Sequence, residues 1–152
     1  MRIGVPKEIK NNEYRVGLVP ATVRELAARG HEVYVETHAG AGIGLEDSDY
    51  EAIGARIVQT AEEVFDAAEM IVKVKEPQAV ERAMLREDHV LFTYLHLAPD
   101  APQTEDLVKS GATCVAMDCP GCMLQIRGGL EKQPTTVRTA HTIELLAESL
   151  DN

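Results

Sequence analysis

Short strand-like runs alternate with helix-like segments along the chain, and this alternation limits the fold more than any other feature. The runs are rich in Val and Ile, and apolar residues recur at helical spacing between them. We expect strands near residues 2–5, 32–36, 55–59, 70–74, 89–95, 112–117 and 136–139. Because strands joined through helices pair in parallel, the pattern predicts a single three-layer α/β/α domain. Its sheet would be doubly wound and mainly parallel, of the flavodoxin-like or Rossmann-like type.

Composition and charge narrow the class of partner. The chain has 152 residues, 45% of them hydrophobic, which suits one compact domain with a sizeable core. Its formal net charge of -10 repels phosphate backbones and anionic surfaces, so we expect no nucleic acid and no membrane as a partner. No apolar run approaches the ~20 residues that span a bilayer, and the first residues lack a signal-peptide pattern. We therefore expect a cytoplasmic protein, either a monomer or a small homo-oligomer.

Three side chains follow predicted strands and suggest a binding site. They are Arg15, Lys75 and His96. In open parallel sheets, ligands bind beyond the carboxyl ends of the strands, where the strand order reverses. Arginine offers a planar fork for a carboxylate, lysine a point charge for a carbonyl oxygen, and histidine a proton donor or acceptor near neutral pH. A small 2-oxo acid would satisfy all three, although residues of these types are more often solvated surface residues.

Four stretches within residues 1–117 resemble the amino-terminal, substrate-binding part of alanine dehydrogenases, a family related to the proton-translocating transhydrogenases. They are "MRIGVPKEIKNNEYRVGLVPATV", "GHEVYVETHAGAGIG", "MIVKVKEP" and "LFTYLHLAP". In that family, hydride passes between alanine or pyruvate and a nicotinamide cofactor. The resemblance implies that Arg15 holds the substrate carboxylate, Lys75 its carbonyl or imine side, and His96 the acid or base role. It also implies that Tyr94 lines the pocket.

Two positions beside Arg15 depart from the family pattern. Tyr14 and Gly17 stand where the family pattern has asparagine and alanine, so we expect an altered loop. Lys73 shares a strand face with Lys75, and the pattern leaves open which of the two is the solvent-exposed end of the strand, with its charge in water. His89, near a predicted turn, is interpreted as a surface residue.

The glycines of "HAGAGIG" do not make a dinucleotide-binding turn. The three glycines are Gly40, Gly42 and Gly44, and the third comes one residue too soon for the pattern G-x-G-x-x-G. We therefore favour a loop whose backbone needs positive φ. The resemblance places the family's nicotinamide on a second domain, and we find no such domain in this sequence. We therefore expect no cofactor and no enzymatic activity, with a vestigial pocket that includes His96.

Residues 118–152 resemble a different family. "DCPGCMLQIRGGLEKQ" and "VRTAHTIELLAESL" are similar to the end of the cysteine-rich CCG domain of heterodisulfide reductase subunits and glycolate oxidase iron-sulfur subunits. Those domains complete their cluster with an upstream Cys-Cys-Gly element that this sequence lacks, so Cys119 and Cys122 carry half of a ligand set. Our leading interpretation is a chimera, de novo, engineered or reassembled, in which residues 1–117 are alanine-dehydrogenase-like. Residues 118–152 would cover the core that residues 1–117 leave exposed.

Three alternatives stay open. The chain could be a pyruvate or alanine binding module, with weak binding because the family's pocket closes against the second domain and an open half leaves the ligand in water. The CPGC motif at a predicted helix start could be a thiol-disulfide site, because a helix N-terminus lowers the pKa of its first thiol. Cys119 and Cys122, with His141, could bind a metal or an iron-sulfur cluster, although a structural zinc site needs four donors. Cys114, within an apolar strand, is interpreted as a buried small residue.

Overall fold

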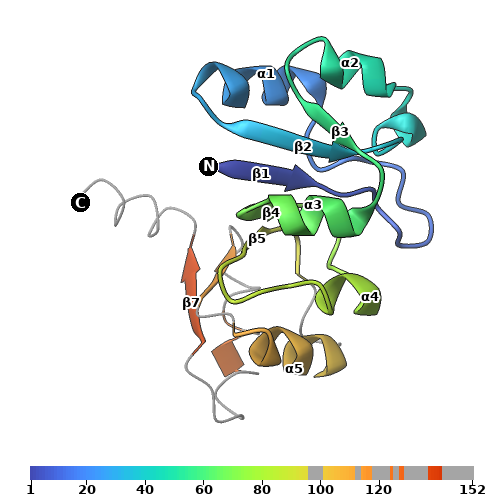
Figure 1. The fold of residues 1–152 in the computed structure, drawn as a ribbon. Helices are drawn as coiled ribbons and strands as arrows, with labels where there is room; N and C mark the ends of the chain where they lie inside the picture. Colours follow the sequence, from blue (N-terminus) through green and yellow to red (C-terminus); the bar gives the residue numbers. More distant parts are fainter. Residues whose placement is uncertain (96–100, 112–113, 118–123, 125–126, 129–136, 142–152) are drawn as a thin grey trace. The chain divides into compact units, whose positions relative to one another are not determined.

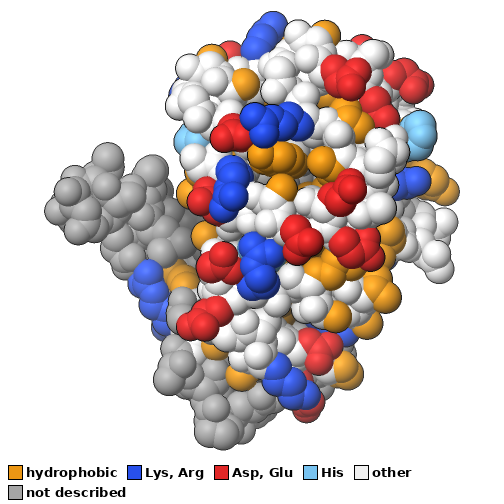
Figure 2. All heavy atoms as spheres, viewed as in Figure 1, with side chains coloured by type: hydrophobic (Ala, Val, Ile, Leu, Met, Phe, Trp, Pro, Cys, Tyr) orange, Lys and Arg blue, Asp and Glu red, His pale blue; other side chains and the backbone are white. Residues whose placement is uncertain are grey.

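The structure is a computed structural model that describes residues 1–95, 101–111, 114–117, 124, 127–128 and 137–141. The chain divides into two compact units, Met1–Tyr94 and Leu95–Asn152, and each is described by itself (Figure 1). Within the described residues, no helix is long and apolar enough to cross a membrane. On the face drawn in Figure 2, Lys and Arg side chains lie among Asp and Glu side chains.

The first unit is built on a five-stranded parallel sheet. Its strands are β1 (Arg2–Val5), β2 (Glu32–Glu36), β3 (Arg56–Val58), β4 (Met70–Val72) and β5 (Val90–Phe92). Their order is β3-β2-β1-β4-β5, so the chain reverses its direction of travel across the sheet beside β1. The predicted α/β class with a parallel, Rossmann-like sheet is confirmed.

Helices of the first unit connect these strands. They are α1 (Pro20–Ala28), η1 (Ala41–Ile43), α2 (Asp47–Glu51), α3 (Ala61–Ala67) and α4 (Ala79–Arg82). The start of α3 is set locally by Thr60, whose hydroxyl oxygen accepts a hydrogen bond from the Glu63 N–H at 3.3 Å. Right-handed crossovers place helices on opposite faces of the sheet once the strand order reverses, which gives the predicted layers.

Apolar side chains form a separate buried layer on each face of the sheet. The α1 and α2 side contains Ile3, Val5, Val23, Val33, Val35 and Tyr50, and the α3 side contains Val64, Phe65, Ala68 and Ile71. Alternation along β1 explains the division, because Ile3 and Val5 face one layer and Gly4 faces the other. A Cβ atom at Gly4 would lie 2.7 Å from Val64 Cγ1, so glycine lets α3 approach β1 closely.

The second unit contains a smaller sheet. Helix α5 (Ala101–Lys109) precedes β6 (Cys114–Met117), which pairs in parallel with β7 (Arg138–His141) in a two-stranded sheet. The tail strand predicted at 136–139 is therefore present but lies two residues further along. Cys114 is half-buried rather than fully buried.

His89 caps the end of α3 and is not a simple surface residue. Its Nδ1 accepts a hydrogen bond from the Arg86 N–H at 3.1 Å, so Nε2 carries the proton and donates to the Phe65 carbonyl at 2.9 Å. Burial, with the charge of Arg86, lowers the pKa of His89 below its ordinary 6.5. The interpretation of His89 as a surface residue is wrong, because sequence position near a turn does not show which carbonyls lie beside it.

The lowered pKa of His89 predicts a loss of stability in mild acid. Because the unfolded chain binds a proton at a higher pH than the folded one, His89 contributes its full stability above about pH 6.5, and the contribution falls as the pH drops towards the folded pKa. Urea unfolding at several pH values should show this decline, and His89→Gln should flatten it. His38→Asn, at an exposed position with φ of 61°, should keep the decline. Equal slopes in the wild type and His89→Gln would contradict the assignment.

Candidate functional site

The candidate site lies at the carboxyl edge of the five-stranded sheet, where β1 and β4 are neighbours. A long loop after β1 carries Glu13 and Arg15 before α1 begins at Pro20. The segment after β4 carries Lys75, and Tyr94 follows β5. Carboxyl ends of parallel strands meet at one edge, so these side chains come together from three loops.

Arg15 is held by Glu13. The Glu13 carboxylate accepts hydrogen bonds from Arg15 Nε at 2.8 Å, from Nη2 at 2.6 Å and from the main-chain N–H at 2.9 Å. These contacts lower the pKa of Glu13 to about 2, chiefly through the side-chain hydrogen bond from Arg15. The Glu13 side chain is 6% exposed and that of Arg15 is 61% exposed. The Arg15 guanidinium therefore lies at the surface, and the Glu13 carboxylate fixes its Nε and Nη2 side.

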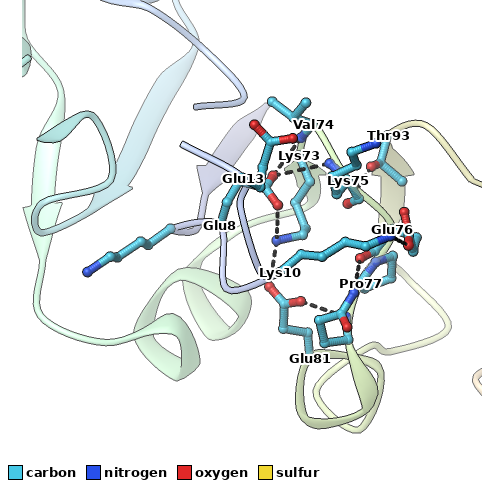
Figure 3. Close-up of polar contacts among 12 residues, drawn as sticks. Glu8, Lys10, Glu13, Lys73, Val74, Lys75, Glu76, Pro77, Glu81 and Thr93 are labelled. Atoms are coloured by element: carbon cyan, nitrogen blue, oxygen red, sulfur yellow. Dashed lines mark hydrogen bonds and ion pairs between the residues drawn. The ribbon is translucent and has the colours of Figure 1, made fainter. Parts of the chain in front are cut away.

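Lys75 is fixed through its main chain. Its N–H donates to Glu8 Oε1 at 3.3 Å, and its carbonyl accepts a hydrogen bond from the Thr93 hydroxyl at 2.8 Å (Figure 3). The residue is half-buried, and its charge contributes to the lowered pKa of Glu13. Lys75 and Arg15 therefore act on the same carboxylate from two different loops.

The structure thus brings together three of the residues that the sequence pointed to, Arg15, Lys75 and Tyr94. Tyr94 is 69% exposed and lies near enough to Arg15 to contribute to the raised pKa of that arginine. His96 lies outside the described residues. The roles implied for all four residues stay predictions.

Sequence reasoning missed a buried cluster of charges beside this edge. Lys73 Nζ lies 2.6 Å from Glu81 Oε1 and 3.3 Å from Glu8 Oε2, and the side chains of all three are at most 2% exposed (Figure 3). Lys73 is therefore the buried lysine of the pair and Lys75 the more exposed one. The sequence held one signal for this cluster, since Lys73 directly follows an apolar strand. A lysine buried at such a position needs a partner of opposite charge.

The glycine run after β2 supports the Arg15 loop. A Cβ atom at Gly42 would lie 2.5 Å from the Tyr14 carbonyl oxygen, and one at Gly40 would lie 2.8 Å from Leu45 Cβ. Only Gly44 of the three has positive φ, at 77°. Gly40 and Gly42 serve close packing and Gly44 the turn, so the run does not fit a cradle for the phosphates of a nicotinamide cofactor, as the sequence spacing indicated.

Cys119 and Cys122 are outside the described residues. Among the residues that are described, no group of three His, Cys, Asp or Glu side chains could hold a metal ion.

Comparison with known proteins gives the family. Residues 4–121 match the profile of the family described as "Alanine dehydrogenase/PNT, N-terminal domain". An alanine dehydrogenase of Halomonas elongata is 54% identical over 118 residues, covering 78% of this chain and 32% of that protein. One of Bacillus subtilis is 50% identical over 118 residues, covering 78% of this chain and 31% of that protein.

Solved structures agree with the sequence match. An L-alanine dehydrogenase structure aligns with a TM-score of 0.70 at 51% identity, covering 72% of this chain and 30% of that one. A transhydrogenase from Sinorhizobium meliloti aligns with a TM-score of 0.68 at 30% identity, covering 73% of this chain and 33% of that one. The chain therefore spans about a third of the length of the relatives it matches.

These findings correct two expectations. The expectation that the chain is not an enzyme is wrong for its family, because relatives at about 50% identity are named alanine dehydrogenase. The proposed chimera has no support, since the family match continues past Met117 to residue 121 and the resemblance to a CCG domain is not supported. On the extent and identity of these matches, the chain belongs to the alanine dehydrogenase/PNT family, through its N-terminal domain.

Proposed function

We propose that the carboxyl edge of the five-stranded sheet binds a small 2-oxo acid such as pyruvate, or the corresponding amino acid alanine, for an alanine dehydrogenase-type enzyme. The observation that carries this proposal is the meeting of Arg15 and Lys75 at the point where the strand order reverses. Two cations from separate loops match the two oxygen-bearing ends of a 2-oxo acid.

Each side chain has a distinct task in this proposal. Arg15 binds the substrate carboxylate with the side of its fork that Glu13 does not use, since Glu13 takes Nε and one Nη2 hydrogen. Lys75 polarises the carbonyl oxygen, or holds the imine side, through its ammonium charge. Tyr94 lines the mouth of the site. His96 donates a proton to the substrate oxygen or nitrogen or removes one from it, as the resemblance implies.

Substrate binding is the part of the reaction that the described residues support. A nicotinamide cofactor would supply hydride transfer in an alanine dehydrogenase. The glycine run after β2 does not fit that group, because it packs against Tyr14 and Leu45. The contribution proposed for this chain is therefore to bind the substrate and orient its carbonyl carbon.

The tail has a structural role in this proposal. Strand β7 pairs in parallel with β6 over four residue pairs from Cys114↔Arg138 to Met117↔His141. The covering role expected of residues 118–152 stays a prediction. The single-domain organisation, the oligomeric state, and a thiol-disulfide or metal site at Cys119 and Cys122 stay predictions.

A pyruvate titration tests the proposal. Pyruvate at millimolar concentration should shift the NMR signals of the Arg15 and Lys75 side chains in the full chain. Arg15→Ala should weaken binding at least about ten-fold, because it removes a charge-assisted contact and leaves Glu13 to repel the anion. Arg24→Ala, at an exposed position on α1, is the matched control and should bind as the wild type does. No shifts at about 10 mM pyruvate, or equal affinity in the two variants, would contradict the proposal.

A further inference from the structure

Lys75 is anchored on both sides of its main chain. Glu8 Oε1 accepts the Val74 N–H at 2.6 Å and the Lys75 N–H at 3.3 Å, and the Thr93 hydroxyl donates to the Lys75 carbonyl at 2.8 Å. Glu8 comes from the loop after β1 and Thr93 from the residue after β5. Residues that follow the two strands beside β4 thus fix the Lys75 backbone, and with it the point from which the Lys75 side chain extends.

Glu8 is itself held by buried charges. Its second oxygen lies 3.3 Å from Lys73 Nζ, and Lys73 also contacts Glu81 at 2.6 Å (Figure 3). Glu81 is fixed in turn, because its other oxygen accepts the Gln78 N–H at 2.7 Å at the start of α4. The carboxylate that holds Lys75 is therefore fixed to the segment of residues 73–75, and through Lys73 it is linked to Glu81 in α4.

Stability alone does not account for this arrangement. Burying three charged groups is costly, and apolar residues of similar volume often serve a core as well or better. Hydrogen bonds from such a network to the main chain do, however, hold the backbone in one geometry. Here the contacted backbone is that of Val74 and Lys75, directly at the candidate site.

We propose that Glu8 and Thr93 are positioning residues that fix the Lys75 backbone and so direct its ammonium group at the substrate carbonyl. This inference rests on the proposed function for the role of Lys75. Functional sites need such support, because a displacement of about 1 Å in a binding group weakens its contact strongly. Neither residue is required to touch the substrate.

The first test removes the Thr93 hydroxyl. Thr93→Val should weaken pyruvate binding about five-fold, the effect of one hydrogen bond, and Thr93→Ser should restore it. Thr37→Val is the matched control: Thr37 is also half-buried and donates to Asp47 at 2.6 Å, away from Lys75. We expect both valine variants to lose similar stability and only Thr93→Val to lose affinity. Equal affinity in Thr93→Val and Thr37→Val, or no rescue by serine, would overturn the role of Thr93.

The second test needs no ligand. Glu8→Met, which removes the acceptor oxygens at similar volume, should speed hydrogen exchange at the Val74 and Lys75 amides about ten-fold or more relative to the Ile71 amide in the sheet. Unchanged exchange at both amides in the folded variant would overturn the role of Glu8. If the wild type binds no pyruvate, the proposed function fails, and the exchange rates still decide whether Glu8 fixes this backbone.

Discussion

Lys73→Met is expected to lower the free energy of unfolding by about 3 to 5 kcal/mol, the usual result of removing one partner from a buried ion pair. The side chain of Lys73 is 1% exposed and is the cation between Glu8 and Glu81. Methionine fills a similar volume but leaves two buried carboxylates without a counter-charge. Urea unfolding followed by circular dichroism gives the measurement, with the m-value checked for two-state behaviour.

Lys75→Met is the matched control for this prediction. The substitution is the same, two residues further along, but Lys75 is half-buried and has no ion pair with a buried carboxylate among the described contacts. We expect a change of less than about 1 kcal/mol. In Lys73→Met, further replacement of Glu8 and Glu81 by glutamine should recover part of the loss, because it removes the unpaired charges. Equal stabilities for Lys73→Met and Lys75→Met would show that the cluster does not contribute as argued.

The fold could be predicted from the sequence, and a place for the candidate site proposed from it, because both follow from local patterns. Alternating strand and helix signals imply a parallel sheet, and a parallel sheet brings the carboxyl ends of its strands to one edge. Arg15 and Lys75 follow strands, so both are placed at that edge without knowledge of strand order, whereas their closeness depends on β1 lying beside β4. Their separation by 60 positions along the chain does not matter once that edge is defined.

The partners of these residues could not be predicted in the same way. Glu8, Lys73 and Glu81 become neighbours only because β1 lies beside β4, and hydrophobic periodicity does not state which strands are adjacent. Glu13 binds Arg15 within an irregular loop, where residue spacing fixes no geometry. The expectation of no enzymatic activity failed for a different reason. It was argued from a segment not found in the sequence, whereas family membership depends on the residues that are present.

Gly17→Ala introduces the residue of the family pattern, yet it is the second substitution with a large expected effect, because the loop after β1 lies too close to β4 in this chain for a Cβ atom. A Cβ atom at Gly17 would lie 2.5 Å from the Val72 carbonyl oxygen and 2.9 Å from its carbonyl carbon. Both atoms belong to the backbone of β4, so no side-chain rotation can relieve the overlap. We expect a loss of about 1 to 3 kcal/mol in the free energy of unfolding, as for other overpacked positions. Gly128→Ala is the control, because no atom lies within 4 Å of its Cβ position, and it should keep or raise stability.

Gly17→Ala should also weaken substrate binding. Gly17 is two residues from Arg15, and Val72 precedes Lys73 at the start of the segment that carries Lys75. Relief of the overlap must move the loop after β1 away from the end of β4, and this movement separates the two cations that the proposed site requires. Pyruvate affinity should therefore fall at least about five-fold in Gly17→Ala, beyond what partial unfolding explains. A variant that is less stable yet binds pyruvate like the wild type would show that this close approach serves packing alone.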